Sequence, residues 1–146
     1  AIPGALPPLG GWVCGTGKIE SGALILFSIL FFWQIPHFYS IAWIHRKDYA
    51  KVGFKMLPIY NSNLKRTSFY CVFFKILLII STSSLTWIGL TDQLFLYGSL
   101  LIGLIFLYFS IETFSKWTYK KAKRLLIGSI LYLPVLLFIL ILDKSF

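Results

Sequence analysis

The 146-residue chain is 58% hydrophobic and 18% aromatic, with only 13% charged residues and a net charge of +9. Its apolar residues form long blocks that a soluble core of this size does not need, so the sequence indicates a membrane protein. Eleven of the fourteen basic residues fall in two loops between these blocks. Because such clustering is typical of the inner loops of membrane proteins, we expect no nucleic-acid partner.

Four apolar windows reach the roughly 18–25 residues that cross a bilayer as a helix. These windows are residues 22–44, 67–90, 93–114 and 125–142. A fifth apolar segment, residues 1–13, is too short to cross, and we interpret it as the end of a helix that starts upstream. The sequence therefore predicts an all-α, polytopic transmembrane helix bundle in a single domain, and we expect the chain to be a C-terminal fragment.

The connections between the windows alternate in charge along the chain. The loops at 46–66 and 115–124 contain eleven Lys and Arg residues, whereas the connections at 14–21 and 91–92 contain Lys18 as their only base. We therefore expect both basic loops to face the cytoplasm, or the matrix in a mitochondrial membrane. The connection at 91–92 is so short that its flanking helices must form an antiparallel hairpin.

The first complete window contains polar residues in its second half, at Gln34 and His37, on either side of Pro36. Because proline has no backbone N–H, the helix loses a hydrogen bond, and we expect it to kink or open there. Ionisable groups inside a membrane usually have a function, so we predict that Gln34 and His37 contact a substrate. The alternative is that they satisfy the broken helix or bond to a neighbouring helix.

Aromatic residues of the same window, including Trp33 and Phe38, are predicted to line a wall for an apolar substrate tail. If the helix continues past its proline, His37 and Asp48 share one face at a separation of about 16 Å. An isoprenoid chain has a length of this order. The alternative is that these aromatic side chains pack against other helices, face lipid or form an interfacial belt.

A charged cluster follows this window directly. It comprises Arg46, Lys47, Asp48, Tyr49, Lys51 and, slightly further along, Lys55. A diphosphate leaving group needs a divalent cation, and Mg²⁺ bridges phosphates while taking one or two protein carboxylates. We therefore predict that Asp48 binds the metal and that Lys51 and its basic neighbours neutralise the charge that develops on the leaving group. The alternative is a solvated loop with an incidental aspartate.

Other polar residues are less directly connected with this chemistry. Glu112 is the other carboxylate on the proposed active side, but we expect it to pair with Lys116, four residues later. Lys75 lies inside a window and is expected to extend its ammonium group towards the inner surface. Cys14 and Cys71 lack the spacing of a metal site and are predicted to be free thiols.

Several motifs, in this order and spacing, resemble one known family, the protohaem IX farnesyltransferases or haem O synthases. The motifs are Ala-Ile-Pro-Gly-Ala-Leu-Pro-Pro-Leu-Gly-Gly-Trp at 1–12, Trp-Gln-Ile-Pro-His-Phe at 33–38, Lys-Asp-Tyr-Ala-Lys-Val-Gly at 47–53 with Met-Leu-Pro at 56–58, and Ala-Lys-Arg-Leu at 122–125 with Ser129 and Tyr132. The resemblance covers nearly the whole chain.

This resemblance implies a UbiA-type intramembrane prenyltransferase fold of nine transmembrane helices, of which the chain would supply the end of the fifth and the sixth to ninth. It also implies that farnesyl diphosphate ionises with Mg²⁺ assistance and that its allylic cation alkylates a vinyl group of haem B, after which water completes haem O. The protein would lie in a bacterial inner membrane, among membrane lipids, or alternatively in the mitochondrial inner membrane.

The resemblance also assigns roles to residues. Asp48 matches the family's second acidic motif, which holds Mg²⁺ and diphosphate, and Lys51 and His37 complete the predicted catalytic set. The predicted substrate-binding residues are Arg46, Lys47, Tyr49, Lys55, Gln34, Trp33 and Phe38. Because the family's first acidic motif belongs to a missing N-terminal half, we expect the chain to be inactive alone.

Three other interpretations remain open at this point. A related prenyltransferase would act on a quinone precursor. A transporter segment would use Pro36 and His37 as a solute or proton site, but would need a polar path to the outer surface. A purely structural subunit would give no reason for Gln34, Pro36, His37 and Asp48 to occur together.

Overall fold

The structure, a computed structural model, describes residues 2–53, 55–60 and 64–144. These residues form helices joined by turns, with no strand among them. Four helices are long and apolar enough to cross a membrane. They are α2 (Ser21–Ile44), α5 (Leu64–Trp87), α6 (Gln93–Ile111) and α7 (Tyr119–Lys144). The predicted all-α transmembrane bundle is confirmed.

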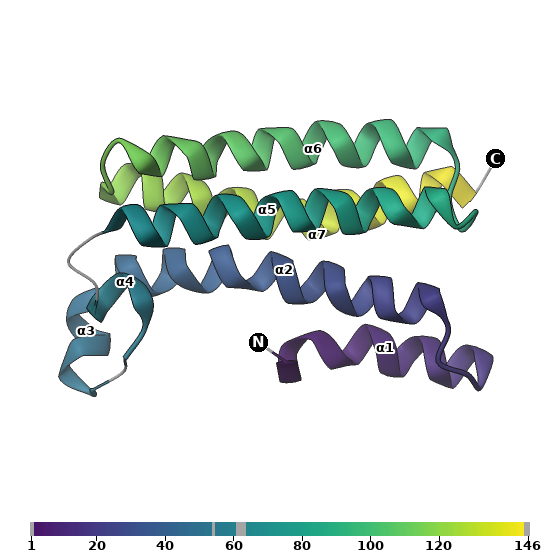
Figure 1. The fold of residues 1–146 in the computed structure, drawn as a ribbon, viewed down its shortest axis with the longest axis horizontal. Coiled ribbons are helices and arrows are strands. Elements are labelled where there is room, and N and C mark those ends of the chain that lie inside the picture. Colours follow the sequence, from purple (N-terminus) through teal and green to yellow (C-terminus); the bar gives the residue numbers. More distant parts are fainter. Residues whose placement is uncertain (1, 54, 61–63, 145–146) are drawn as a thin grey trace.

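Shorter helices lie at both ends of these four. Helix α1 (Ile2–Thr16) packs on α2 and covers only part of its length, as Figure 1 shows. Helices α3 (Arg46–Lys51) and α4 (Leu57–Tyr60) lie together at the opposite end of the bundle, and the 3₁₀ helix η1 (Glu112–Phe114) follows α6. Helix α1 therefore does not reach the part of α2 that is nearest to α3 and α4.

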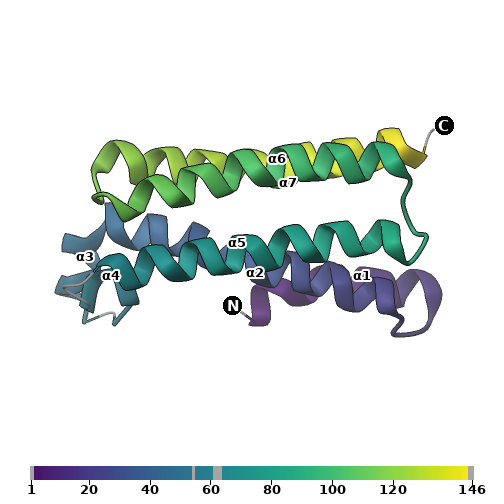
Figure 2. The ribbon, with the colours of Figure 1, turned by 45° about the horizontal axis from the view of Figure 1, so that its top comes forward.

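The four long helices form a ring of neighbours. Helix α2 packs against α5 and α7, and α6 packs against the same two helices from the other side. Figures 1 and 2 together show this ring as two layers, with α2 and α5 in one layer and α6 and α7 in the other. The interior of this ring is where polar side chains of the spans can find protein partners.

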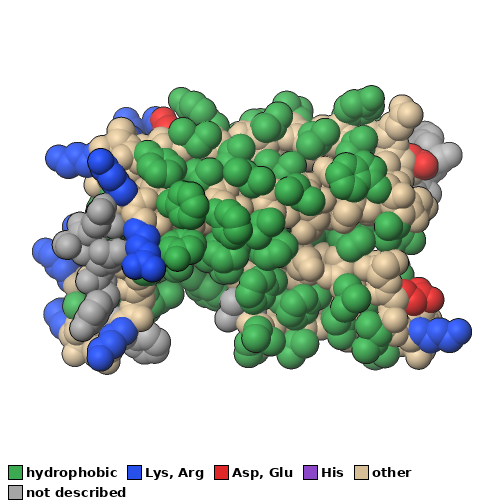
Figure 3. Space-filling model, in the orientation of Figure 1, with side chains coloured by type: hydrophobic (Ala, Val, Ile, Leu, Met, Phe, Trp, Pro, Cys, Tyr) green, Lys and Arg blue, Asp and Glu red, His purple; other side chains and the backbone are tan. Residues whose placement is uncertain are grey.

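The distribution of apolar and polar side chains is the one expected for a helix bundle surrounded by lipid. Large apolar side chains such as Leu101 and Phe138 are exposed, whereas the hydroxyl residues Thr82, Ser99 and Ser110 are buried. This arrangement is expected because hydrocarbon offers no hydrogen bonds, so polar groups turn inward. Figure 3 shows the resulting apolar band, with Lys and Arg side chains gathered at the end that contains α3 and α4.

Glycines allow the helices to approach closely at two places inside the ring. A Cβ atom on Gly103 of α6 would lie 2.8 Å from Cγ1 of Ile79 on α5. A Cβ atom on Gly128 of α7 would lie 2.9 Å from Cδ2 of Phe109 on α6. Small residues at such contacts are typical of membrane bundles, where close packing replaces the hydrophobic effect as the driving force.

Helices α5 and α6 form the predicted hairpin, and a residue distant in sequence fastens it. Gly89 adopts φ 74° in the turn, a conformation that favours glycine. The carboxylate of Asp143, at the end of α7, accepts hydrogen bonds from the backbone N–H groups of Asp92 (2.7 Å) and Phe95 (2.9 Å). Asp143 is only 5% exposed. It thus caps the first turn of α6 in place of a local side chain.

Helix α2 runs from Ser21 to Ile44 with Pro36 inside it, so it does not open at the proline. Two sequence-based expectations about polar residues are wrong. Lys75 does not reach the surface: it is 1% exposed, and its Nζ atom lies over the ring of Phe106 on α6. The face of α5 that contains Lys75 points into the interior of the four-helix bundle. Glu112 pairs with Arg124 of α7 at 3.6 Å rather than with Lys116.

Asp143→Ala should lower the free energy of unfolding by about 1–2 kcal/mol, because two N–H groups of α6 lose their acceptor. The measurement is thermal or denaturant unfolding in detergent. Glu20→Ala is the control, since Glu20 precedes α2 without any side-chain cap. Equal effects of the two substitutions would contradict the proposed cap.

Candidate functional site

A polar cluster lies between α2 and α7, inside the membrane-spanning part of the bundle. The Nδ1 atom of His37 lies 2.7 Å from Oγ of Ser129. The indole Nε1 of Trp33 donates a hydrogen bond of 2.8 Å to the backbone carbonyl of the same serine. Trp33 and His37, one helical turn apart, also stack, with ring centroids 4.8 Å apart and planes at 18°. One residue of α7 therefore fixes two residues of α2.

The other two predicted site residues of this helix face in different directions. Gln34 is 4% exposed and lies against α1, where the absence of a side chain on Gly4 leaves room for its amide. Phe38 is 44% exposed, and its ring meets His37 edge-on at 5.7 Å. The His37 ring thus lies between the face of Trp33 and the edge of Phe38.

The charged cluster lies on the surface, on α3 and the residues after it. Asp48 is 72% exposed, and its Oδ1 atom lies 3.4 Å from Nζ of Lys51. Arg46, Lys47 and Lys51 are exposed, as is Lys55 beyond the helix, and Tyr49 is half-buried. An exposed pair of this kind contributes little to stability, so stability alone does not explain the cluster.

A turn at His45 separates the two groups of predicted site residues. Helix α2 ends at Ile44 and α3 begins at Arg46, and His45 has φ −98° and ψ 22°. The expectation that His37 and Asp48 share one face of a continuous helix is therefore wrong, because the chain changes direction between them (Figure 1). The intramembrane group and the surface group instead lie on successive helices.

Aromatic residues at the basic end fix where α3 begins. The guanidinium of Arg46 lies 4.3 Å from the ring centroid of Trp43 and donates a hydrogen bond of 3.0 Å to its carbonyl. Trp43 packs against Trp117, whose Nε1 donates to Oγ of Ser68 at 2.8 Å. Thr113 donates to the same oxygen. This buried network ties the end of α2 to α5 and to the segment before α7.

Asp48 is the one carboxylate on α3 and the described residues that follow it up to Tyr60. No group of three His, Cys, Asp or Glu side chains comes together within residues 2–53, 55–60 and 64–144. Mg²⁺ is commonly bound by one or two protein carboxylates together with phosphate oxygens and water. In its chemistry and exposure, Asp48 is therefore a residue that could contribute one ligand to such a metal.

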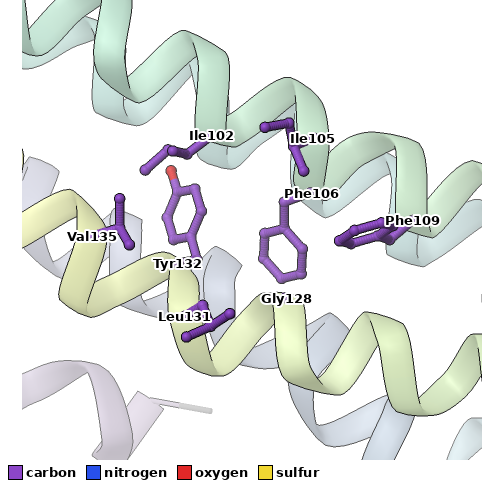
Figure 4. Close-up of a pocket in the computed structure, with 8 residues that line it drawn as sticks. All are labelled: Ile102, Ile105, Phe106, Phe109, Gly128, Leu131, Tyr132 and Val135. Carbon is purple, nitrogen blue, oxygen red and sulfur yellow. The ribbon is translucent and has the colours of Figure 1, made fainter.

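A cavity of about 250 Å³ lies elsewhere, between α6 and α7. Figure 4 shows its apolar lining, with the rings of Phe106 and Tyr132 side by side. None of the predicted site residues lines it. Its lining offers neither a charge nor a metal ligand, so we do not assign it to the candidate site.

Sequence reasoning missed the partner that organises the intramembrane group. Ser129 was part of a motif match but was given no role, because its contacts with Trp33 and His37 span 96 and 92 residues. The available signal was the one serine in a strongly apolar span that contains no threonine, since such residues often bond across helices.

Comparison with known proteins identifies the family. The profile of the UbiA prenyltransferase family matches residues 1–141. The chain belongs to the UbiA prenyltransferase family. No solved structure gives a significant match.

Three of the similar curated proteins share a name. The chain is 40% identical over 144 residues to a protein of Solibacter usitatus named protoheme IX farnesyltransferase, covering 99% of this chain and 49% of that protein. A protein of Opitutus terrae with the same name is 39% identical over 148 residues, covering 100% of this chain and 50% of its own length. One from Flavobacterium johnsoniae is 40% identical over 149 residues, covering 99% and 49%. The chain spans about half the length of these relatives.

Trp33→Phe should lower the free energy of unfolding by about 1 kcal/mol, because the carbonyl of Ser129 loses its indole donor. Trp12→Phe is the matched control: the indole Nε1 of Trp12 is buried without a hydrogen-bond partner in the described part of the chain. That change should be neutral or stabilising. Unfolding in detergent, followed by circular dichroism, measures both, and a larger loss for Trp12→Phe would contradict the assigned contact.

Proposed function

We propose that the chain forms the C-terminal half of an enzyme that transfers a farnesyl group from farnesyl diphosphate to a vinyl group of haem B, giving haem O. The observation that supports this most is the match of the whole chain to half of proteins named protoheme IX farnesyltransferase, at 33–40% identity. Membership in the UbiA prenyltransferase family supports the reaction class.

The distribution of polarity fits a donor with an apolar tail and a charged head. The surface of the spanning part of the bundle is largely apolar, whereas Arg46, Lys47, Lys51 and Lys55 lie at one end (Figure 3). Basic side chains there bind the diphosphate oxygens and stabilise the charge that grows as the carbon–oxygen bond breaks. Tyr49, half-buried on the same helix, offers a further hydrogen bond to the head group.

Asp48 is the residue that holds the divalent cation in this proposal. The Asp48 carboxylate would supply one ligand to Mg²⁺, whose positive charge would stabilise the leaving diphosphate. Lys51, at 3.4 Å from Asp48, lies beside the carboxylate and is placed to contact the same diphosphate. The remaining metal ligands come from the missing N-terminal half.

The intramembrane group binds the acceptor and the tail. Trp33, His37 and Phe38 form an aromatic surface on α2, and flat rings of this kind suit a porphyrin or a prenyl chain. Gln34 supplies an amide next to this surface. Because aromatic faces attract cations, they also shelter the allylic cation from water until the vinyl group attacks it.

The enzyme lies in a bacterial inner membrane, with its basic end on the cytoplasmic side. This orientation follows from the positive-inside rule, because both basic loops lie at one end of the bundle. Farnesyl diphosphate reaches Asp48 from that side, while the porphyrin and the prenyl tail stay within the bilayer.

Asp48→Asn in the complete enzyme should reduce haem O formation about 100-fold or more, because the amide is a poor ligand for Mg²⁺. Quantitative mass spectrometry of haem products in membranes of equal protein content measures the effect. Asp92→Asn is the control, since Asp92 is exposed at the opposite end of the bundle and forms no side-chain cap. Near-normal haem O formation by Asp48→Asn would contradict the metal role.

A further inference from the structure

The hydrogen bonds around Ser129 determine which nitrogen of His37 carries a hydrogen. The Oγ atom of Ser129 lies 2.5 Å from the carbonyl oxygen of Leu126 and 2.7 Å from Nδ1 of His37. Two oxygens this close repel each other unless a hydrogen lies between them, and serine has one hydroxyl hydrogen. Ser129 therefore donates to Leu126 and accepts from His37, so Nδ1 of His37 is the protonated nitrogen.

This assignment leaves Nε2 of the neutral imidazole with its lone pair. No hydrogen bond to Nε2 forms within the described part of the chain. The ring cannot turn freely to change this, because it stacks on Trp33, which is itself bonded to the carbonyl of Ser129. Both contacts originate from one residue of α7, so the ring has a fixed tautomer and a fixed direction.

A histidine held in this way matches the usual environment of a metal ligand in proteins. Metal-binding histidines almost always donate their second ring N–H to an oxygen of the protein, which orients the ring and makes the other nitrogen a better donor. Here that oxygen is the Ser129 hydroxyl. Neutral imidazole is also a common axial ligand of haem iron.

We propose that Nε2 of His37 coordinates the iron of the haem substrate as an axial ligand during farnesyl transfer. This inference rests on the proposed function, because it takes haem B as the acceptor. The bond forms from the Nε2 lone pair to an open axial position of the iron, and no proton leaves because Nε2 carries none. Coordination fixes the porphyrin against α2 and restricts where its vinyl groups lie.

The Nε2 lone pair has one alternative role, and the experiment must distinguish that role from iron coordination. As a general base, Nε2 would accept the proton that water loses when it adds to the alkylated vinyl group. That role needs no bond to iron. It would leave the ligand field of bound haem unchanged when His37 is replaced, whereas coordination requires a change in that field even before farnesyl diphosphate is added.

Resonance Raman spectroscopy of the complete enzyme, purified in detergent and loaded with ferrous haem B alone, tests the inference. The iron–imidazole stretching band should be present in the wild type and in His45→Ala, the matched control, since His45 is the chain's only other histidine and is exposed. The band should be lost in His37→Ala and in His37→Gln, and added free imidazole should restore it in His37→Ala.

Ser129→Ala tests whether Ser129 affects the iron–imidazole band. If Ser129 had only a structural role, the frequency of this band would not change. This variant keeps the backbone carbonyl that binds Trp33 but removes the acceptor of the Nδ1 hydrogen. The band should remain and shift to lower frequency, because the imidazole becomes a weaker electron donor. An unshifted band would overturn the assigned role of Ser129 in tuning His37.

Two results would overturn the coordination itself: an iron–imidazole band that persists in both His37 variants, or haem-loaded wild type without the band. Thermal unfolding of each variant checks that it is folded. Haem O formation by the same wild-type preparation is measured separately. If that product forms while the band does not depend on His37, the proposed function survives and the iron ligand is wrong; if no product forms, the proposed function itself fails.

Discussion

The absence of water in the hydrocarbon core is the constraint on which this structure depends. Every polar group of a span must find its partner inside the protein, and an unpaired one costs several kcal/mol. On α2 this requirement is met by α7, because Ser129 binds both Trp33 and His37. The same bonds that hold two helices together therefore also orient an imidazole ring inside the membrane.

The same constraint explains the basic end of the bundle, because charged side chains are most stable where water is available. Most Lys and Arg side chains lie where the helices leave the membrane, with Lys75 of α5 an exception, and the turn at His45 brings α3 to that surface. The contact between Arg46 and Trp43 fixes the start of α3 against the buried network around Ser68. An apolar membrane-spanning surface therefore adjoins an anchored charged segment.

The surface position of Asp48 is consistent with part of a binding site that another segment completes. Its carboxylate is 72% exposed, and within the described ranges it belongs to no group of three His, Cys, Asp or Glu side chains. Helix α1 covers only part of the length of α2 (Figure 1), which leaves room beside the rest of α2 for another segment. In relatives, a further half of the chain is available to supply that segment.

Hydropathy and charge predicted the number of spans, their approximate bounds and the clustering of basic loops, because these depend on bilayer thickness and on local composition. The partners of individual polar residues were not predictable in the same way. Ser129, Asp143 and Lys75 all contact residues of other helices. The direction in which each side chain points depends on the rotation of its helix about its own axis. Lys75 shows this most clearly: local reasoning sent its ammonium group to the surface, whereas the packing of α5 turns it inward.

Co-expression of this chain with the N-terminal half of a relative tests the account most directly. The two halves together, supplied with haem B, farnesyl diphosphate and Mg²⁺, should yield haem O by mass spectrometry, and neither half alone should do so. An assembled pair that binds both substrates but yields no farnesylated haem, or one that prenylates a different acceptor in its place, would contradict the account.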